Sequence, residues 1–97
     1  MSDHVCDREF VATFDGEAQR VVAEWAKPVR DRGSWRCDYA IHWPHRDEMR
    51  GYAVGIDSTP AMLLAMAQAA ARIEVESPDA DWLESGGLGL PETPAAR

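Results

Sequence analysis

Two histidines lie close together in the stretch "AIHWPHRDEM", residues 40–49, and they are the first candidates for chemistry in this chain. Asp38 and Asp47 are near His42 and His45 in the sequence. Imidazole and carboxylate groups together form a ligand set that zinc and other transition metals accept. Such a site needs several ligands that converge on one point. Whether these side chains can converge depends on the strands and turns that carry them.

The residues before the Trp43–Pro44 step alternate between apolar and polar types. This period of two predicts a half-buried strand from Trp35 to Trp43, which Pro44 ends because it lacks a backbone N–H. On that strand His42 lies on the polar face, while Cys37 points to the opposite face and cannot join it as a ligand.

We therefore interpret His42, His45 and Asp38 as residues of a solvated hairpin end. A metal-binding or catalytic role for these three residues is the weaker hypothesis, because a histidine pair alone is weak evidence for a site. We predict no cofactor and no catalytic residue.

Nucleophilic catalysis finds little support. Cys37 is predicted to be a buried, unreactive thiol, and Ser58 is predicted to cap a helix. Glu24, Asp38 and Glu48 could act as acids or bases, but nothing in the sequence distinguishes them from an ordinary charged face.

A first hairpin is predicted around Asp15–Gly16, because both residues tolerate the positive φ values of a tight turn. The apolar positions that alternate on either side of it are Phe10, Ala12, Phe14, Val21, Ala23 and Trp25. Pro28 ends the second strand, and residues 28–34 are predicted to form a loop.

The strand after the turn at residues 44–47 has two different faces. Tyr52, Val54 and Ile56 share one face, and the small residues Gly51, Ala53 and Gly55 share the other. Small residues on one face predict a bulge or a closely packed neighbour.

A helix follows, which Ser58 or Thr59 can cap and whose first turn accommodates Pro60. One apolar stripe contains Met62, Met66, Ala69, Ala70 and Ile73, and an adjoining one contains Leu64, Ala67, Ala71 and Val75. Gln68, Arg72, Glu74 and Glu76 are predicted to face solvent. Because the apolar arc is wider than one sheet contact requires, either the C-terminal segment around Trp82 or another chain is expected to cover Leu64, Ala67, Ala71 and Val75.

These elements predict one α+β domain over residues 1–90, a four-stranded antiparallel meander followed by one long helix (ββββα). A C-terminal irregular tail is expected to pack on the body, with residues 91–97 frayed.

The composition excludes some functions. The 97 residues carry a formal net charge of -7, which repels a nucleic-acid backbone. No apolar run approaches the roughly 18 residues of a transmembrane helix, and the N-terminus lacks the pattern of a signal peptide. With Cys6 and Cys37 expected to be free thiols, a cytoplasmic location is expected.

The segments "WRCDYAIHWP" and "GYAVGIDSTPAMLLAMAQAAARI" resemble a family of small, uncharacterised bacterial domains. In that family a Trp-x-Cys strand and a hairpin lead to a G-[IV]-D step, a Leu/Ala-rich helix, and a tail with Trp-Leu, matched here over residues 35–91. The resemblance implies no established activity. It implies that Gly55, Asp57, Leu64 and Trp82 serve the fold, as a tight strand exit, a helix cap and a tail anchor.

We expect a non-enzymatic binding or accessory module that works through protein–protein contacts, with no nucleic-acid or membrane partner. The partner is another protein or a second copy in a homodimer, bound through the helix or the small-residue face of the sheet. The expected interaction residues are Leu64, Ala67, Ala71, Val75 and Trp82. Two alternatives stay open: a small metal-dependent or hydrolytic enzyme centred on His42, His45 and Asp38, and a toxin-neutralising, immunity-like protein.

Overall fold

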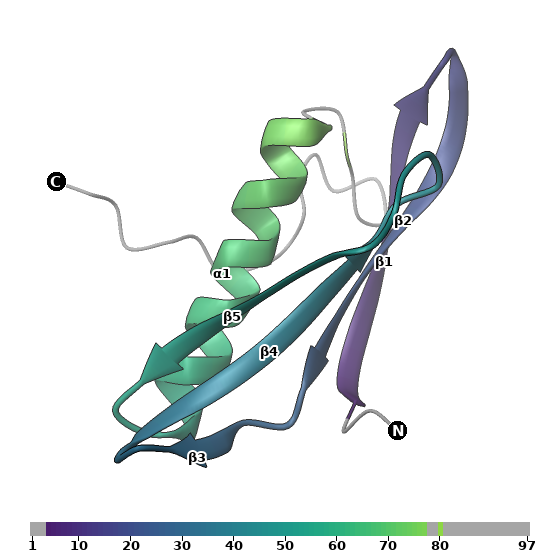
Figure 1. Cartoon of the computed structure of the whole chain (residues 1–97). Helices are drawn as coiled ribbons and strands as arrows, with labels where there is room; N and C mark the ends of the chain where they lie inside the picture. Colours follow the sequence, from purple (N-terminus) through teal and green to yellow (C-terminus); the bar gives the residue numbers. More distant parts are fainter. Residues whose placement is uncertain (1–3, 78–79, 81–97) are drawn as a thin grey trace, which may run out of the picture.

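The computed structural model describes residues 4–77 and residue 80 (Figure 1). It contains five strands and one helix: β1 (His4–Phe14), β2 (Glu17–Ala26), β3 (Val29–Asp31), β4 (Ser34–His42), β5 (Met49–Gly55) and α1 (Ser58–Glu76). The predicted tail and the anchor Trp82 lie outside the described residues. The fold is α+β, with an antiparallel sheet followed by one helix, as the sequence predicts.

The strands form one antiparallel sheet in which β1 pairs with β2, and β4 pairs with β2, β3 and β5. β2 and β3 pair with successive parts of β4, on the side opposite β5. The arrangement is therefore a four-stranded meander whose second strand is interrupted at Lys27 and Pro28.

Two tight turns set the register of the hairpins. Asp15 and Gly16 have φ values of 51° and 80°, as expected for a two-residue turn that matches the twist of its strands. Arg32 and Gly33 have φ values of 54° and 82° and connect β3 to β4 in the same way. The prediction of a loop over residues 28–34 is therefore wrong, because Arg32–Gly33 closes a second short hairpin and β3 forms beside β4.

The inner face of the sheet, which we define as the face that packs on α1, carries the apolar residues of the alternating pattern. The helix lies against β5 and β4 and reaches β2 (Figure 1). The fully buried large side chains are Phe10, Val21, Trp25, Cys37, Ile41 and Ile73. Alternation thus predicts correctly which positions of β1, β2 and β4 enter the core.

The small-residue face of β5 is the surface on which α1 packs. A Cβ atom at Gly55 would lie 2.6 Å from the backbone nitrogen of Ala61, and one at Gly51 would lie 2.5 Å from Tyr39 Oη. The expected close neighbour is therefore the chain's own helix and the Tyr39 ring. That face is not available to a partner.

The helix begins after Asp57, whose side chain accepts a hydrogen bond of 2.9 Å from the backbone N–H of Thr59. Asp57 is the cap that the family resemblance implies, and the assignment of the cap to Ser58 or Thr59 is wrong. Without an apolar run of sufficient length, α1 is not a membrane-spanning helix, and no other helix occurs among the described residues.

Gln68 and Arg72 tie the helix to the sheet through the hydroxyl of Tyr39. This hydroxyl donates to Gln68 Oε1 at 3.2 Å and accepts from Arg72 Nε at 2.8 Å. Arg72 is exposed, as predicted, whereas Gln68 is half-buried. Both also bond to Tyr39, because this long side chain on the inner face of β4 reaches the edge of the helix. Ala61 and Ala65, which neither predicted stripe includes, are fully buried as well.

Candidate functional site

The outer face of the sheet, which we define as the face opposite α1, brings together polar side chains from four strands. Pairing places Glu24 beside Ala40 on β4, and Ala40 beside Arg50 on β5. On the far side of β2, Asp7 is the direct partner of Glu24. One transverse row of this face therefore runs Asp7, Glu24, Ala40 and Arg50.

The neighbouring rows follow from the same register. Val22 pairs with Glu9 on β1 and with His42 on β4. In the opposite direction along β4, Asp38 pairs with Tyr52 on β5. Ala40 is consequently a small residue at the centre of a face whose other positions are mostly long and polar.

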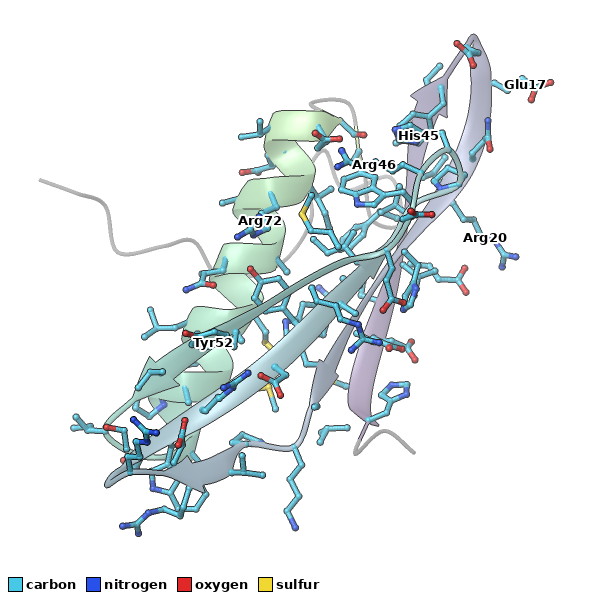
Figure 2. All side chains as sticks on the ribbon, in the orientation of Figure 1. Glu17, Arg20, His45, Arg46, Tyr52 and Arg72 are labelled. Carbon is cyan, nitrogen blue, oxygen red and sulfur yellow. The ribbon has the colours of Figure 1, made fainter. Side chains whose placement is uncertain are left out.

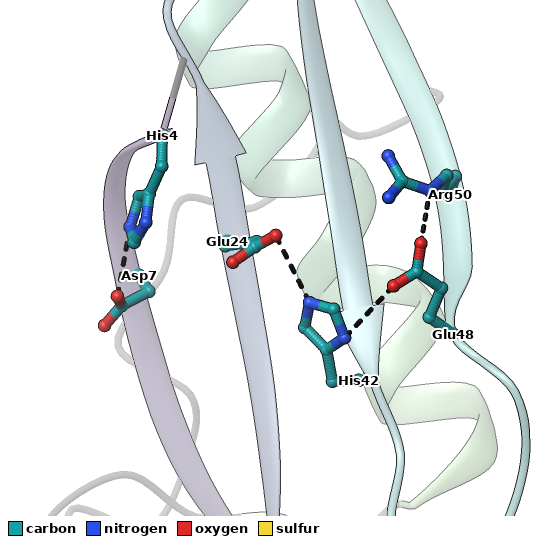
Figure 3. A network of polar contacts seen from close by, with 6 residues as sticks. All are labelled: His4, Asp7, Glu24, His42, Glu48 and Arg50. Carbon is teal, nitrogen blue, oxygen red and sulfur yellow. Dashed lines mark hydrogen bonds and ion pairs between the residues drawn. The ribbon is translucent and has the colours of Figure 1, made fainter. Parts of the chain in front are cut away.

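His42 lies at the centre of a polar network on this face (Figure 3). Its Nε2 is 3.2 Å from Glu24 Oε1, and its Nδ1 is 3.3 Å from Glu48 Oε1. Arg50 donates from Nε to the other oxygen of Glu48. A neutral imidazole donates from one nitrogen only, whereas an imidazolium donates to both carboxylates. Because Glu24 is in β2, His42 in β4 and Arg50 in β5, the network joins these three strands.

A second polar pair lies beside Tyr52. Arg36 Nε donates to Asp38 Oδ1 at 2.8 Å, and the Arg36 guanidinium stacks 4.1 Å from the centroid of the Tyr52 ring. The hydrogen bond and the charge of Asp38 raise the pKa of the Arg36 guanidinium above its ordinary value. Arg36 is therefore held as a cation against an exposed aromatic ring.

Two hollows flank this network. The first is a recess of about 50 Å³ over Ala40, with Glu24, Asp38, His4 and Arg50 among its lining residues. Ala40 is only 3% exposed although it faces away from the helix, because its longer neighbours shield it. The second hollow is wider and more open, about 440 Å³, and is lined by Glu9, Arg20, Val22, His42, Trp43 and Pro44.

His45 does not join His42. His45 is labelled in Figure 2. Its ring stacks on Phe14, with centroids 4.4 Å apart, and meets Trp43 edge-on at 5.9 Å. Asp38 binds Arg36, and His42 binds two glutamates. Within residues 4–77 and 80, no three His, Cys, Asp or Glu side chains are grouped so that they could hold a metal ion. The three candidate ligands therefore have separate partners.

Cys37 does not provide a nucleophile for His42. Cys37 lies on the inner face, where burial, the largest cause, and the nearby Asp38 and Cys6 raise the pKa of its thiol to about 11. The thiol form therefore predominates at neutral pH. As predicted from the alternation, Cys37 and His42 occupy opposite faces of β4.

The predicted interaction residues of the helix differ in accessibility. Val75 is 81% exposed and Ala71 is exposed, whereas Leu64 is half-buried and Ala67 is only 2% exposed. Trp82 lies outside the described residues. A partner that approached this side of α1 would meet Val75 and Ala71 first.

Similarity to known proteins identifies the family but no activity. A family model described as a domain of unknown function, DUF6968, matches residues 6–92. The chain belongs to this family. No curated protein and no solved structure matches it. Membership of DUF6968 confirms the predicted kinship with an uncharacterised domain, and the matched region contains the whole outer face from Cys6 onward.

From the sequence alone, Glu24, Asp38 and Glu48 are indistinguishable from an ordinary charged face. The structure places Glu24 and Glu48 on either side of His42, and Asp38 next to Ala40 at the recess. The missing information was the register between β2, β4 and β5. Glu48 and Arg50 share a face because they are two residues apart. This spacing is the one feature of the sequence that indicates part of the network, the contact between Glu48 and Arg50.

Proposed function

We propose that this DUF6968 domain is a non-enzymatic binding module that works through protein–protein contacts, and that the partner docks on the outer face of its sheet. The observation that supports this proposal is the unequal covering of the two faces. α1 packs on the inner face, whereas no element of residues 4–77 packs on the outer face. There Tyr52 is 52% exposed and Val54 is 47% exposed.

An exposed aromatic ring beside an arginine is a common feature of protein interfaces. Tyrosine and arginine are enriched at binding hot spots, because they combine a large contact area with directed hydrogen bonds. Tyr52 and Arg36 form such a pair, and Val54 pairs with Arg36 across β4 and β5. These residues make the β4–β5 side of the outer face the best-supported docking surface.

The partner is a protein rather than a nucleic acid, since a net charge of -7 opposes phosphate binding. Self-association remains a separate proposal and concerns the exposed side of α1. We further propose a cytoplasmic location. Neutralisation of a toxin would be one specific form of this binding function.

Site-specific photo-crosslinking tests the proposal. A photoreactive benzoylphenylalanine replaces Tyr52 in one version of the protein and Val75 in another, and both are expressed in cells that carry the gene. We expect a discrete adduct from position 52 that disappears when Val54→Glu is added. Adducts from position 75 alone would move the interface to the helix. The absence of adducts from both positions would contradict a binding function.

A further inference from the structure

The outer face has an excess of carboxylates over guanidinium groups. Arg20, Arg36 and Arg50 are each engaged by one carboxylate, from Glu9, Asp38 and Glu48 respectively. Within the part of the chain that the structure describes, Asp7 forms its ion pair with His4, and Glu24 forms its ion pair with His42. When both histidines are neutral, the face is net negative.

Asp7 and Glu24 are also direct cross-strand partners. Like charges opposite each other in an antiparallel pair destabilise a sheet, whereas opposite charges at the same positions stabilise it. The two carboxylates instead contact histidines, Asp7 contacting His4 and Glu24 contacting His42 (Figure 3). A cation brought by a partner to this row would reduce their repulsion.

The recess over Ala40 lies next to this pair. Its volume of about 50 Å³ corresponds to a few water molecules, since one needs roughly 10–15 Å³. Glu24 lies on one side of Ala40 and Asp38 precedes it by two residues on the same face of β4. A flat guanidinium or an ammonium group that entered here would meet the carboxylates of Glu24 and Asp38 and the methyl group of Ala40. Arg50 also lines the recess, but its charge is paired with Glu48.

We propose that the outer face docks a basic, extended segment of a protein partner, with one arginine or lysine side chain seated over Ala40 between Glu24 and Asp38. This inference rests on the proposed function and specifies the chemistry of the partner. Charge complementarity favours a basic partner over a second copy of this chain, because a second copy would present the same net negative face. The exposed Tyr52 and Val54 extend the docking surface along β5 beyond the recess.

The test uses the full chain and two labelled pentapeptides, acetyl-Thr-Val-Arg-Val-Thr-amide and the same peptide with citrulline in place of arginine. Citrulline keeps the shape of arginine and removes its charge. In ¹H–¹⁵N spectra at low salt, we expect the arginine peptide to shift the amide signals of Glu24, Asp38 and Ala40 with a dissociation constant of about 1–10 mM. The citrulline peptide should bind at least about tenfold more weakly, since the charge supplies the attraction.

Two variants locate the binding site. Ala40→Leu fills the recess, and Glu24→Gln removes one carboxylate while it keeps the side-chain shape. Each should weaken the arginine peptide at least about fivefold. The matched control Glu74→Gln removes an exposed carboxylate from the helix and should leave binding unchanged. Glu24→Gln keeps the test valid if Ala40→Leu does not fold.

Several results would overturn the proposal. Equal binding of the two peptides would exclude charge recognition, and unchanged binding to both recess variants would exclude the recess. Shifts of the same amides with protein concentration alone would identify a second copy as the occupant. If the photo-crosslink from position 52 persists in Ala40→Leu at full yield, the docking face is correct and the arginine anchor is wrong. If the peptide binds but neither position 52 nor position 75 captures a protein, the binding function itself is contradicted.

Discussion

Cys37 lies in the core between the sheet and the helix. Its Sγ donates to the carbonyl oxygen of Ala26 at 3.3 Å and lies 3.7 Å from Met62 Sδ, and the residue has no exposed surface. These contacts suit a neutral thiol, and burial disfavours the thiolate. The pKa of this thiol is therefore raised in the folded protein to about 11, from an ordinary value of 9.0.

This shift predicts a loss of stability at high pH. Between about pH 9 and pH 11 the unfolded chain loses the Cys37 proton while the folded protein retains it, so the free energy of unfolding falls as the pH rises. By about pH 11 the loss from this group should reach about 2 kcal/mol. Urea unfolding at about pH 8 and pH 11 measures it. Other groups also titrate, so the comparison is with Cys37→Ala, which should lose about 2 kcal/mol less across this range. Equal losses in both proteins would show that the thiol is not the cause.

Between the elements, the sheet and the helix approach each other closely at Gly55. This residue ends β5 just before the helix begins, and any Cβ atom here would meet the backbone of Ala61, which side-chain rotation cannot relieve. At Gly51 the obstacle is the Tyr39 side chain, which has some freedom to move. Gly55 thus leaves room for the backbone of Ala61, and Gly51 leaves room for the side chain of Tyr39.

We expect Gly55→Ala to destabilise the domain by about 2–3 kcal/mol, because it forces α1 away from β5. Gly51→Ala should cost less, since the Tyr39 ring can shift at the expense of its bonds to Gln68 and Arg72. Thermal or urea unfolding of the two variants measures the difference. A smaller effect at Gly55 than at Gly51 would mean that the helix does not sit this close to the strand.

Local patterns predicted the elements well, because each is set by neighbouring residues. Alternation assigned Phe10, Trp25 and Cys37 to the core, and Asp15–Gly16 marked its turn. The second tight turn, at Arg32–Gly33, is not predicted by the local pattern, because arginine rarely adopts a positive φ. The contacts of His42 are not predicted for a different reason. Glu24 and His42 lie on separate strands, so their contact depends on register, which local patterns do not specify.

At the scale of the whole molecule, the domain has two candidate contact surfaces on opposite sides. The outer sheet face is polar and net negative, and it suits a basic partner. The exposed side of α1 carries the apolar residues Ala71 and Val75. It suits a second copy of this chain, since two helices pack closely where small residues face each other. Ile56 is even more exposed, at 90%, but it lies outside the helix.

If α1 mediates a homodimer, Val75→Glu should shift the protein from dimer to monomer in light scattering at micromolar concentration. Each chain of the dimer would then bring a new carboxylate, next to Glu74, into the apolar contact between the two helices. Because these like charges repel each other, the dimer should weaken about tenfold or more. Ile56→Glu adds the same charge at an exposed position off the helix and should leave the dimer intact. Val75 lies on the helix, away from the outer sheet face, so Val75→Glu should bind the arginine peptide as the original protein does. A monomer before any substitution, or a dimer that Ile56→Glu alone dissociates, would remove α1 as the self-association surface and leave the outer face as the proposed contact.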